Sequence, residues 1–267
     1  RESLDAAIRG TDGVAVGLAA GGMIPFASSF AKFLVRGYDQ LEMAAITRAN
    51  VKIVGSHAGI SLGADGPSQM SLADLAFFRG YAQADDGRGN PAAVVFHPAD
   101  AVAAYRLTEL AANLPTLCYV RTHRSDVGLI YPQDARFTLD GFSQLAQGNA
   151  VTLVASGYMT TVALQAVRQL EKAGLKCNLF DAYCLPLNGE PILAAARKAD
   201  GKVLVVEDNF VGGFYSAIAE AAATAGNVKV FGMTCPRVPK SAKTGDLVLQ
   251  AMGLGPADII NRVKSIH

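Results

Sequence analysis

The stretch AAVVFHPADAVAAYRLTELAANLPTLCYVRT, residues 92–122, decides the fold class. It begins with a near-continuous apolar run at 92–98 and ends with another at 116–122. Such runs are typical of strands that are buried on both faces of a sheet. Between them, residues 99–113 are rich in Ala and Leu at helical spacing. A strand, a helix and a second strand at this spacing predict a right-handed crossover within a parallel sheet.

The same alternation occurs on both sides of this unit. A further apolar run, VKIVGS at 51–56, precedes it, and the irregular stretch 125–149 that follows it is interpreted as a linker. Beyond the linker the predicted strands are 151–156, 177–182, 202–208 and 228–233, with helices at 160–173 and near 213–225. The sequence therefore predicts an α/β protein with two parallel-sheet domains, at residues 1–135 and 136–267.

The composition favours some classes of protein over others. Of the 267 residues, 51% are hydrophobic and 18% are charged, which predicts a large buried core and no disorder. A formal net charge of +1 without a long basic run argues against a nucleic-acid partner. Four cysteines that lie far apart predict reduced thiols in a cytoplasmic protein, rather than disulfides or a zinc site.

The uncharged stretch 13–31 is long enough to cross a membrane. Its many Gly and Ala residues and the interruption at Pro25 instead predict two soluble segments. The first would be buried, and the second would be a helix that begins near Pro25. We therefore expect no membrane association.

The stretch GSHAGISLGADGPSQMSLAD, residues 55–74, places His57, Asp65 and Gln69 on a glycine-rich segment after a predicted strand. Open α/β sheets bind ligands at the carboxyl ends of their strands, and glycines allow the backbone to approach a ligand closely. SLAD at 71–74 is a capping-box pattern and predicts the start of the next helix. Taken alone, the three polar side chains fit a ligand site or a solvated surface loop.

Other candidates also allow two interpretations. Phe26, Phe30 and Phe33 recur at helical spacing, as a core face or as a flat surface for a heteroaromatic ring. Arg121 and Arg124 follow a predicted strand, where they suit a phosphate or carboxylate, or form an inter-domain salt bridge. His97, at another strand end, is predicted to be structural, and Glu207 and Asp208 form a polar strand terminus or an interface contact.

Together, several motifs resemble the C-terminal half of transketolases. They begin with GLAAGG and continue through SHAG, DGPSQM and LAFFR, and are followed by HPADAV, ELAAN, VRTHR and VEDNFVGG. The order GSHAG…DGPSQM resembles transketolases rather than thiamine enzymes in general. The resemblance covers nearly all of the chain. It implies a pyrimidine-binding domain followed by a transketolase C-terminal domain.

The resemblance also implies a cofactor, thiamine diphosphate, with Mg²⁺ or Ca²⁺ held by a partner diphosphate-binding domain. Phe33, with Phe30 beside it, would pack against the aminopyrimidine ring, and Gln69 would lie close to the cofactor. The cofactor would act as the electron sink while the protein positions and polarises the substrate.

The substrates implied by the resemblance are sugar phosphates. His57 and Asp65 would hydrogen-bond the sugar, and Arg124 and Arg1 would bind its phosphate. The implied reaction transfers a two-carbon ketol unit from a ketose phosphate to an aldose phosphate.

One departure from the family concerns its catalytic glutamate, expected in an E-Q-N context just before GVAVGLA. IRGTD stands there instead. The strand and crossover expected between Gly10 and Gly13 are absent too, and such a unit needs ~30 residues. We therefore expect the natural polypeptide to contain a further segment at this point.

A second departure is the lack of the diphosphate-binding domain with its GDG…N signature. This favours the C-terminal subunit of a split transketolase over half of a longer chain. Its partner would be an N-terminal subunit, and two such pairs would associate into a heterotetramer. The alternatives are a β subunit of a 2-oxoacid dehydrogenase or deoxyxylulose-phosphate synthase type, or a non-catalytic transketolase-like assembly subunit.

Overall fold

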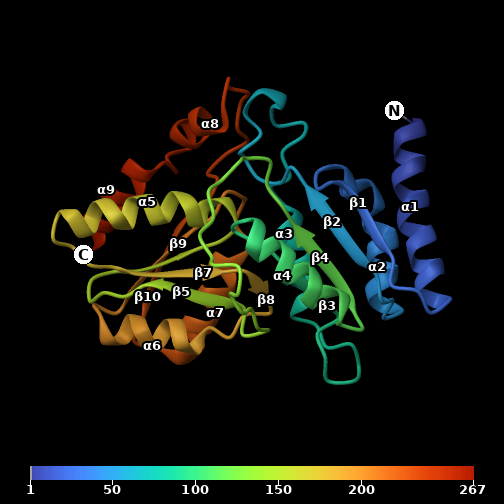
Figure 1. Ribbon diagram of the computed structural model, residues 1–267, viewed down its shortest axis with the longest axis horizontal. Helices are drawn as coiled ribbons and strands as arrows, with labels where there is room; N and C mark the ends of the chain where they lie inside the picture. Colours follow the sequence, from blue (N-terminus) through green and yellow to red (C-terminus); the bar gives the residue numbers. More distant parts are fainter. Residues whose placement is uncertain (1) are drawn as a thin grey trace.

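The computed structural model describes the backbone of residues 2–267 and the side chains of residues 9–267. Two five-stranded sheets lie side by side, each flanked by helices (Figure 1). Both sheets are mainly parallel, as the sequence predicts, and each has one antiparallel strand at an edge. The α/β class with two parallel-dominated sheets is therefore confirmed.

The first sheet has the strand order β1-β2-β4-β3-β8. The first four strands are parallel, whereas β8 runs antiparallel to β3. The strands are β1 (Phe26–Phe30), β2 (Lys52–Ser56), β3 (Ala93–Phe96), β4 (Leu117–Arg121) and β8 (Cys184–Leu185). The accompanying helices are α1 (Glu2–Ala20), η1 (Phe33–Gly37), α2 (Tyr38–Ile46), η2 (Gly63–Asp65), α3 (Asp74–Ala82) and α4 (Ala101–Ala112).

The second sheet has the order β10-β9-β6-β7-β5, with β5 antiparallel to β7. Its strands are β5 (Phe142–Ala146), β6 (Thr152–Ala155), β7 (Asn178–Ala182), β9 (Lys202–Val206) and β10 (Lys229–Met233). Its helices are α5 (Tyr158–Lys172), α6 (Glu190–Lys198), α7 (Phe214–Ala225), α8 (Gly245–Met252) and α9 (Pro256–Ile266). In Figure 1, α5 and α9 lie on one side of this sheet and α6 and α7 on the other.

The two sheets are joined by more than the connecting chain. β8 follows β7 of the second sheet directly in sequence but pairs with β3, so it extends the first sheet. One buried apolar cluster contains Phe78 and Val95 beside the first sheet and Val205 and Phe214 beside the second. The burial of apolar surface therefore continues from one sheet to the other.

The N-terminal segment differs from the prediction. α1 is one helix that passes through Gly10 and Gly13 without interruption, and side chains such as Val14 are exposed rather than buried. No helix begins at Pro25, because Phe26–Phe30 form β1 and pair in register with β2. The helical prediction was wrong. The spacing of the phenylalanines matches a helix, but this segment forms a strand because it pairs with β2, more than twenty residues further along the chain. Within residues 2–267, none of the helices combines the length and apolar character needed to cross a membrane.

The structure differs from the sequence-based prediction at three further places, β5, β8 and the start of α3. β5 lies inside the stretch interpreted as a linker, and its partly buried FSQLA sequence lacks the apolar run of the central strands. The two-residue β8 is too short to produce a pattern. α3 begins at Asp74 rather than Ser71, and its N-cap residue Ala73 offers no side-chain cap. The Ser71 carbonyl instead accepts hydrogen bonds from Gly59 and Arg121.

Candidate active site

The candidate residues gather where three parallel strands of the first sheet end. Phe30 is the last residue of β1, and His57 directly follows β2. Arg124 lies three residues beyond the end of β4. Residues 57–72, which connect β2 to α3, are called the 57–72 loop below. Parallel α/β sheets bind ligands at this edge, which is where the sequence motif predicts the site.

Three stacked aromatic rings and an arginine side chain lie next to one another along this edge. The rings of Phe30 and His57 are stacked, with centroids 4.0 Å apart and planes within 15°. Phe30 also stacks on Phe33 at 5.3 Å, and the Arg36 guanidinium lies 5.1 Å from the centre of the Phe33 ring. The structure thus brings both predicted cofactor-binding phenylalanines into one array with the predicted sugar-binding histidine. Their grouping arises from β1 and η1, not from a helix face.

His57 is held in an unusual backbone conformation. Its φ is 58°, in the left-handed region that residues other than glycine rarely adopt. The next amide, of Ala58, donates to the Thr122 carbonyl at 3.0 Å, and His57 Nδ1 lies 2.9 Å from Ser56 Oγ. Burial lowers the pKa of His57, the positive charge of Arg124 lowers it further, and Asp65 opposes both. The imidazole is therefore neutral at pH 7, a state that suits hydrogen bonds to hydroxyl groups.

Asp65 and Arg124 form an ion pair at this edge. Their side chains are 34% and 50% exposed, so both remain accessible to a ligand. The pair fixes the 57–72 loop against the segment after β4. An incoming phosphate would compete with the carboxylate for the guanidinium.

The structure gives less support to the two other predicted ligand-binding residues, Gln69 and Arg1. Gln69 lies on the 57–72 loop, half-buried, and its backbone N–H donates to the Gly66 carbonyl at 3.1 Å. Its side chain forms no hydrogen bond with the other candidates in the described part of the chain. Arg1 lies outside the described residues, so its predicted role stays a prediction.

Arg121 forms the inter-domain ion pair that was one of its two predicted roles. The guanidinium is fully buried and donates to Asp74 Oδ2 at 2.9 Å and to Asp208 Oδ1 at 3.0 Å. It also contacts His97 Nε2 at 2.8 Å and donates to the Ser71 carbonyl at 3.3 Å. Burial by itself lowers the pKa of Arg121, but the carboxylates of Asp74 and Asp208 outweigh it and raise the pKa. A ligand role for Arg121 is excluded by its burial and its full set of partners.

Glu207 also has a structural role, as expected for a strand terminus. It is fully buried, and its carboxylate accepts the first amides of α7, from Phe214 at 2.8 Å and Tyr215 at 2.7 Å. A carboxylate at a helix N-terminus satisfies free amides and interacts favourably with the helix dipole. Asp208, the next residue, is the interface contact described above.

Asp12 is a buried carboxyl group outside the predicted site. It is 1% exposed and packs against Gly37, where a Cβ would lie 1.9 Å from Asp12 Oδ2. That oxygen has no hydrogen-bond partner among the described residues. Burial raises the pKa of Asp12 to about 6. The sequence offered no signal for this position, because it is buried only through the packing of α1 against β1 and η1.

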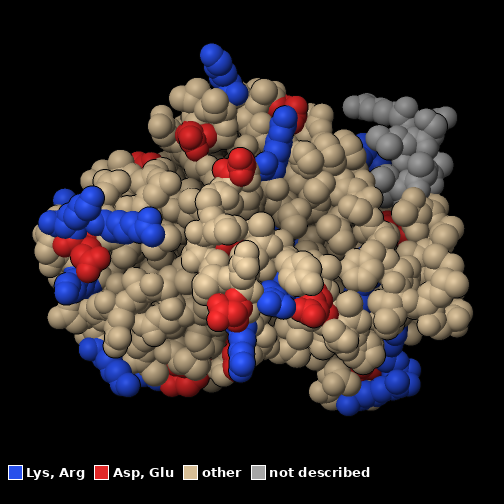
Figure 2. Space-filling model, in the orientation of Figure 1, with Lys and Arg blue, Asp and Glu red and all other residues tan. Residues whose placement is uncertain are grey.

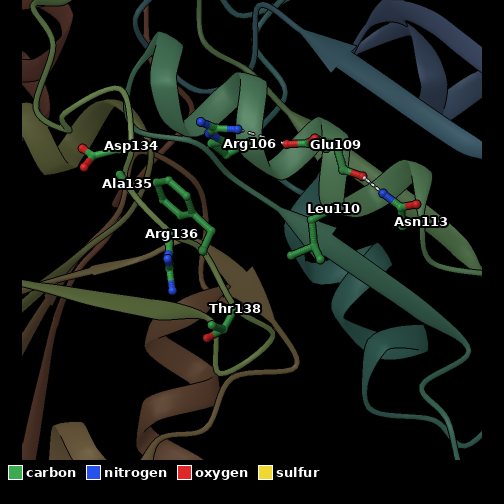
Figure 3. Close-up of a pocket in the computed structure, with 9 residues that line it drawn as sticks. Arg106, Glu109, Leu110, Asn113, Asp134, Ala135, Arg136 and Thr138 are labelled. Carbon is green, nitrogen blue, oxygen red and sulfur yellow. Dashed lines mark hydrogen bonds and ion pairs between the residues drawn. The ribbon is translucent and has the colours of Figure 1, made fainter.

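One cavity lies away from these residues, between α4 and the segment that leads to the second sheet. Its volume is about 540 Å³, and it is lined by Arg106 and Glu109 of α4, by Asn113 just after α4, and by Arg136 and Thr138 (Figure 3). Two of these residues are already paired, since Arg106 contacts Glu109 at 3.3 Å. None of the predicted site residues lines this cavity.

The charged side chains on the surface do not form a further candidate binding site. On the face shown in Figure 2, Lys and Arg lie in small groups interspersed with Asp and Glu. Within residues 9–267, no group of three or more His, Cys, Asp or Glu side chains has a metal-binding arrangement. The edge formed by β1, β2 and β4 is therefore the candidate active site.

Comparisons with known proteins match both halves of the chain. Residues 9–128 match the family described as "Transketolase, pyrimidine binding domain" and residues 142–259 match "Transketolase, C-terminal domain". The transketolases of Mus musculus and Homo sapiens are each 35% identical over 247 residues. These alignments cover 91% of this chain but only 38% of each relative.

Solved structures show the same likeness. The structure titled "Split gene transketolase, inactive beta4 tetramer" is 31% identical, with a TM-score of 0.83, and the match covers 96% of this chain and 80% of that one. The transketolase of Campylobacter jejuni shares the fold, with a TM-score of 0.76 at 21% identity, over 94% of this chain and 37% of its own. With both halves matched, and a relative at 31% identity covered over four fifths of its length, the chain belongs to the transketolase family.

Proposed function

We propose that this chain is the C-terminal subunit of a split transketolase that depends on thiamine diphosphate. It would transfer a two-carbon ketol unit from a ketose phosphate to an aldose phosphate, together with an N-terminal partner subunit in the cytoplasm. The observation that carries the proposal is the array from Phe33 through Phe30 to His57, with the Asp65–Arg124 pair near enough to shift the His57 pKa. This arrangement places an aromatic surface that could pack against a heteroaromatic ring beside polar and charged side chains that could bind a phosphorylated sugar.

The residues present fit one part of the cofactor. Phe30 and Phe33 are half-buried and nearly parallel, with 9° between the planes of their stacked rings, which suits packing against an aminopyrimidine. Gln69, on the neighbouring loop, would approach the same ring. The diphosphate and its Mg²⁺ or Ca²⁺ would be held by the partner's domain. When bound, the cofactor supplies the electron sink for breaking and forming the carbon–carbon bond.

The sugar phosphate would be held by the other side of the site. A neutral His57 can exchange hydrogen bonds with sugar hydroxyls, and the Asp65 carboxylate can accept one. Arg124 would bind the phosphate, with Arg1 as the second phosphate ligand. These groups orient the substrate toward the ring surface, and positioning of this kind lowers the barrier to reaction.

An apolar surface supports the partner subunit. Adjoining elements between α1 and α2 expose eight large apolar side chains, a concentration that marks a surface for protein association. They are Val14, Leu18, Met23, Ile24, Phe26, Val35, Met43 and Ile46. The other six exposed large apolar residues among the described residues are spread over residues 105–247. We assign the part of this surface that the expected segment between Gly10 and Gly13 leaves uncovered to the N-terminal subunit and to the second pair of a heterotetramer.

The absent glutamate supports the rival proposal of a non-catalytic assembly subunit. Intact-mass measurement of the natural polypeptide separates the two. We expect a mass above 27.9 kDa by ~3 kDa or more, and peptide mapping of the same sample should place a segment with the glutamate between Gly10 and Gly13. A mass of 27.9 kDa would remove that explanation.

The proposed function is tested by activity of the reconstituted pair. The natural polypeptide and its N-terminal partner, mixed with thiamine diphosphate and Mg²⁺, should transfer ketol units from xylulose 5-phosphate to an aldose phosphate acceptor. A 2-oxoacid substrate in place of the sugar phosphate tests the dehydrogenase-type alternative. Lack of ketol transfer by a pair that assembles and binds the cofactor would overturn the proposal.

A further inference from the structure

We propose that the second domain, which contributes none of the predicted ligands, fixes the 57–72 loop and thereby positions His57 and Asp65. Gly245, at the start of α8, is the principal positioning residue. This inference rests on the proposed function, since it concerns the same site. It assigns to the second domain a direct effect on how the sugar phosphate is held.

The first line of contact is formed by residues 241–245, just before and at the start of α8. The Ala242 amide donates to the Gly63 carbonyl at 3.1 Å. A Cβ on Gly245 would lie 2.4 Å from the Ser61 carbonyl oxygen, and a Cβ on Gly63 would lie 2.6 Å from the Thr244 carbonyl carbon. The two backbones are therefore in direct contact, which only glycine permits at both places. Figure 1 shows the segment that leads to α8 beside the loop between β2 and α3.

The second line of contact lies at the two ends of the loop. A Cβ on Gly59 would lie 1.7 Å from Asp208 Oδ2, so this buried carboxylate packs directly on the loop backbone. At the other end, the Phe210 amide donates to the Leu72 carbonyl at 2.8 Å. Arg121 links the two ends, because it binds both Asp208 and the carbonyl of Ser71.

The loop needs this external support. Apart from the single turn of η2 it has no regular structure, and His57, Gly59, Gly63 and Gly66 all have positive φ. Such conformations persist only when the surroundings determine them, above all at a non-glycine residue such as His57. Asp65 lies in η2, whose first residue, Gly63, is held by the segment before α8, so a shift of that segment's backbone moves Asp65 directly.

Gly245 offers a selective test of this dependence. Its φ lies outside the positive range, so alanine costs α8 nothing in backbone strain, and the added methyl group must displace the Ser61 carbonyl. Gly255, which precedes α9, is the matched control. A Cβ there would meet only Asp258 Oδ2 at 3.4 Å and Gln250 Cγ at 3.8 Å, both within the second domain.

The experiment compares Gly245→Ala and Gly255→Ala in the reconstituted pair. For Gly245→Ala we expect the KM for the ketose phosphate to rise ~10-fold with kcat changed less than ~3-fold, because the displaced groups bind substrate. Amide hydrogen exchange across residues 58–69 should become faster. Gly255→Ala should leave both quantities as in the wild type. An unchanged KM and unchanged exchange in a folded Gly245→Ala variant, or equal changes in both variants, would overturn the inference.

A replacement variant and a readout that needs no turnover allow the positioning role to be tested in every case. If Gly245→Ala does not fold, Ser241→Ala replaces it, since Ser241 Oγ packs on Gly66, where a Cβ would lie 2.2 Å away. Faster exchange around Gln69 is then expected, and unchanged exchange contradicts the inference. Hydrogen exchange needs no turnover, so a wild-type pair without ketol transfer refutes the proposed function while exchange still decides the positioning role.

Discussion

His57 stacks on Phe30 with ring centroids 4.0 Å apart, so a side chain predicted to bind the sugar rests on one predicted to bind the cofactor. The contact crosses from β1 to the residue after β2, two strands that are hydrogen-bonded neighbours. The rigid pairing of the strands thus sets the relation between the two halves of the candidate site.

Removing the imidazole should weaken the binding of sugar. We expect His57→Ala to lower kcat/KM for ketol transfer by ~10–100-fold, the effect of about 1.5–3 kcal/mol of lost hydrogen bonding. The affinity for thiamine diphosphate should change less, because Phe30 and Phe33 remain. Steady-state kinetics and cofactor titration measure the two effects. His267→Ala, at the exposed end of α9, is the control, and an equal loss there would contradict the assignment.

Arg124 should discriminate phosphorylated from unphosphorylated sugars. We expect Arg124→Ala to raise the KM for a ketose phosphate ~10–100-fold, because a charge-assisted hydrogen bond to phosphate is lost. The KM for an unphosphorylated ketose should change little. Arg106→Ala is the control, since that arginine is similarly exposed and ion-paired but lies beside the remote cavity. Equal effects on both sugars would exclude a phosphate role.

The buried Arg121 network should be essential for stability. Arg121→Met leaves the buried carboxylates of Asp74 and Asp208 without their cation, which we expect to cost about 3–5 kcal/mol of the free energy of unfolding. Urea denaturation measures the change. As a comparison, Arg197→Ala removes a partly exposed ion pair with Glu190 and should cost less than about 1 kcal/mol. Similar losses in both variants would contradict the prediction.

Asp12 should make the protein less stable as the pH rises. Its folded-state pKa of about 6 lies above the ordinary value of 3.8, so the folded state binds more protons between these two values. Stability is therefore lost as pH rises through this window and stays lower above it. In the 267-residue chain, Asp12→Asn should remove this contribution and raise stability at pH 7.5 by about 1–3 kcal/mol relative to the unsubstituted 267-residue chain. Chemical denaturation at pH 4.5 and 7.5 tests this, and a difference independent of pH would refute it.

Much of the fold was predictable because the central strands are apolar on both faces. The runs at β2, β3, β4, β6, β7 and β9 are buried throughout or nearly so, and a local sequence pattern records that burial. β1 and β5 gave no such signal. They lie at sheet edges, where their partly polar sequences are made into strands by pairing with a neighbour.

The candidate site was predictable only in part, for a related reason. The motif GSHAG…DGPSQM marks His57 and Asp65 by residue type, but the stacking of His57 on Phe30 depends on the pairing of β1 with β2. The same spacing that suggested a helix for the phenylalanines hid this arrangement. Similarly, no local pattern separates Arg121 from Arg124. Three residues apart, one is fully buried in an ion network and the other is half exposed.

The pairing of β8 with β3 has a consequence for the order of folding. The outer edge of β3 is covered by Cys184 and Leu185, which leave the ribosome about ninety residues after β3 itself. During synthesis the first sheet therefore stays open at this edge until much of the second domain has emerged. An unpaired strand edge is a template for aggregation, so the first domain expressed by itself should be prone to self-association. The two domains are in this sense a single unit of folding, although each has a sheet of its own.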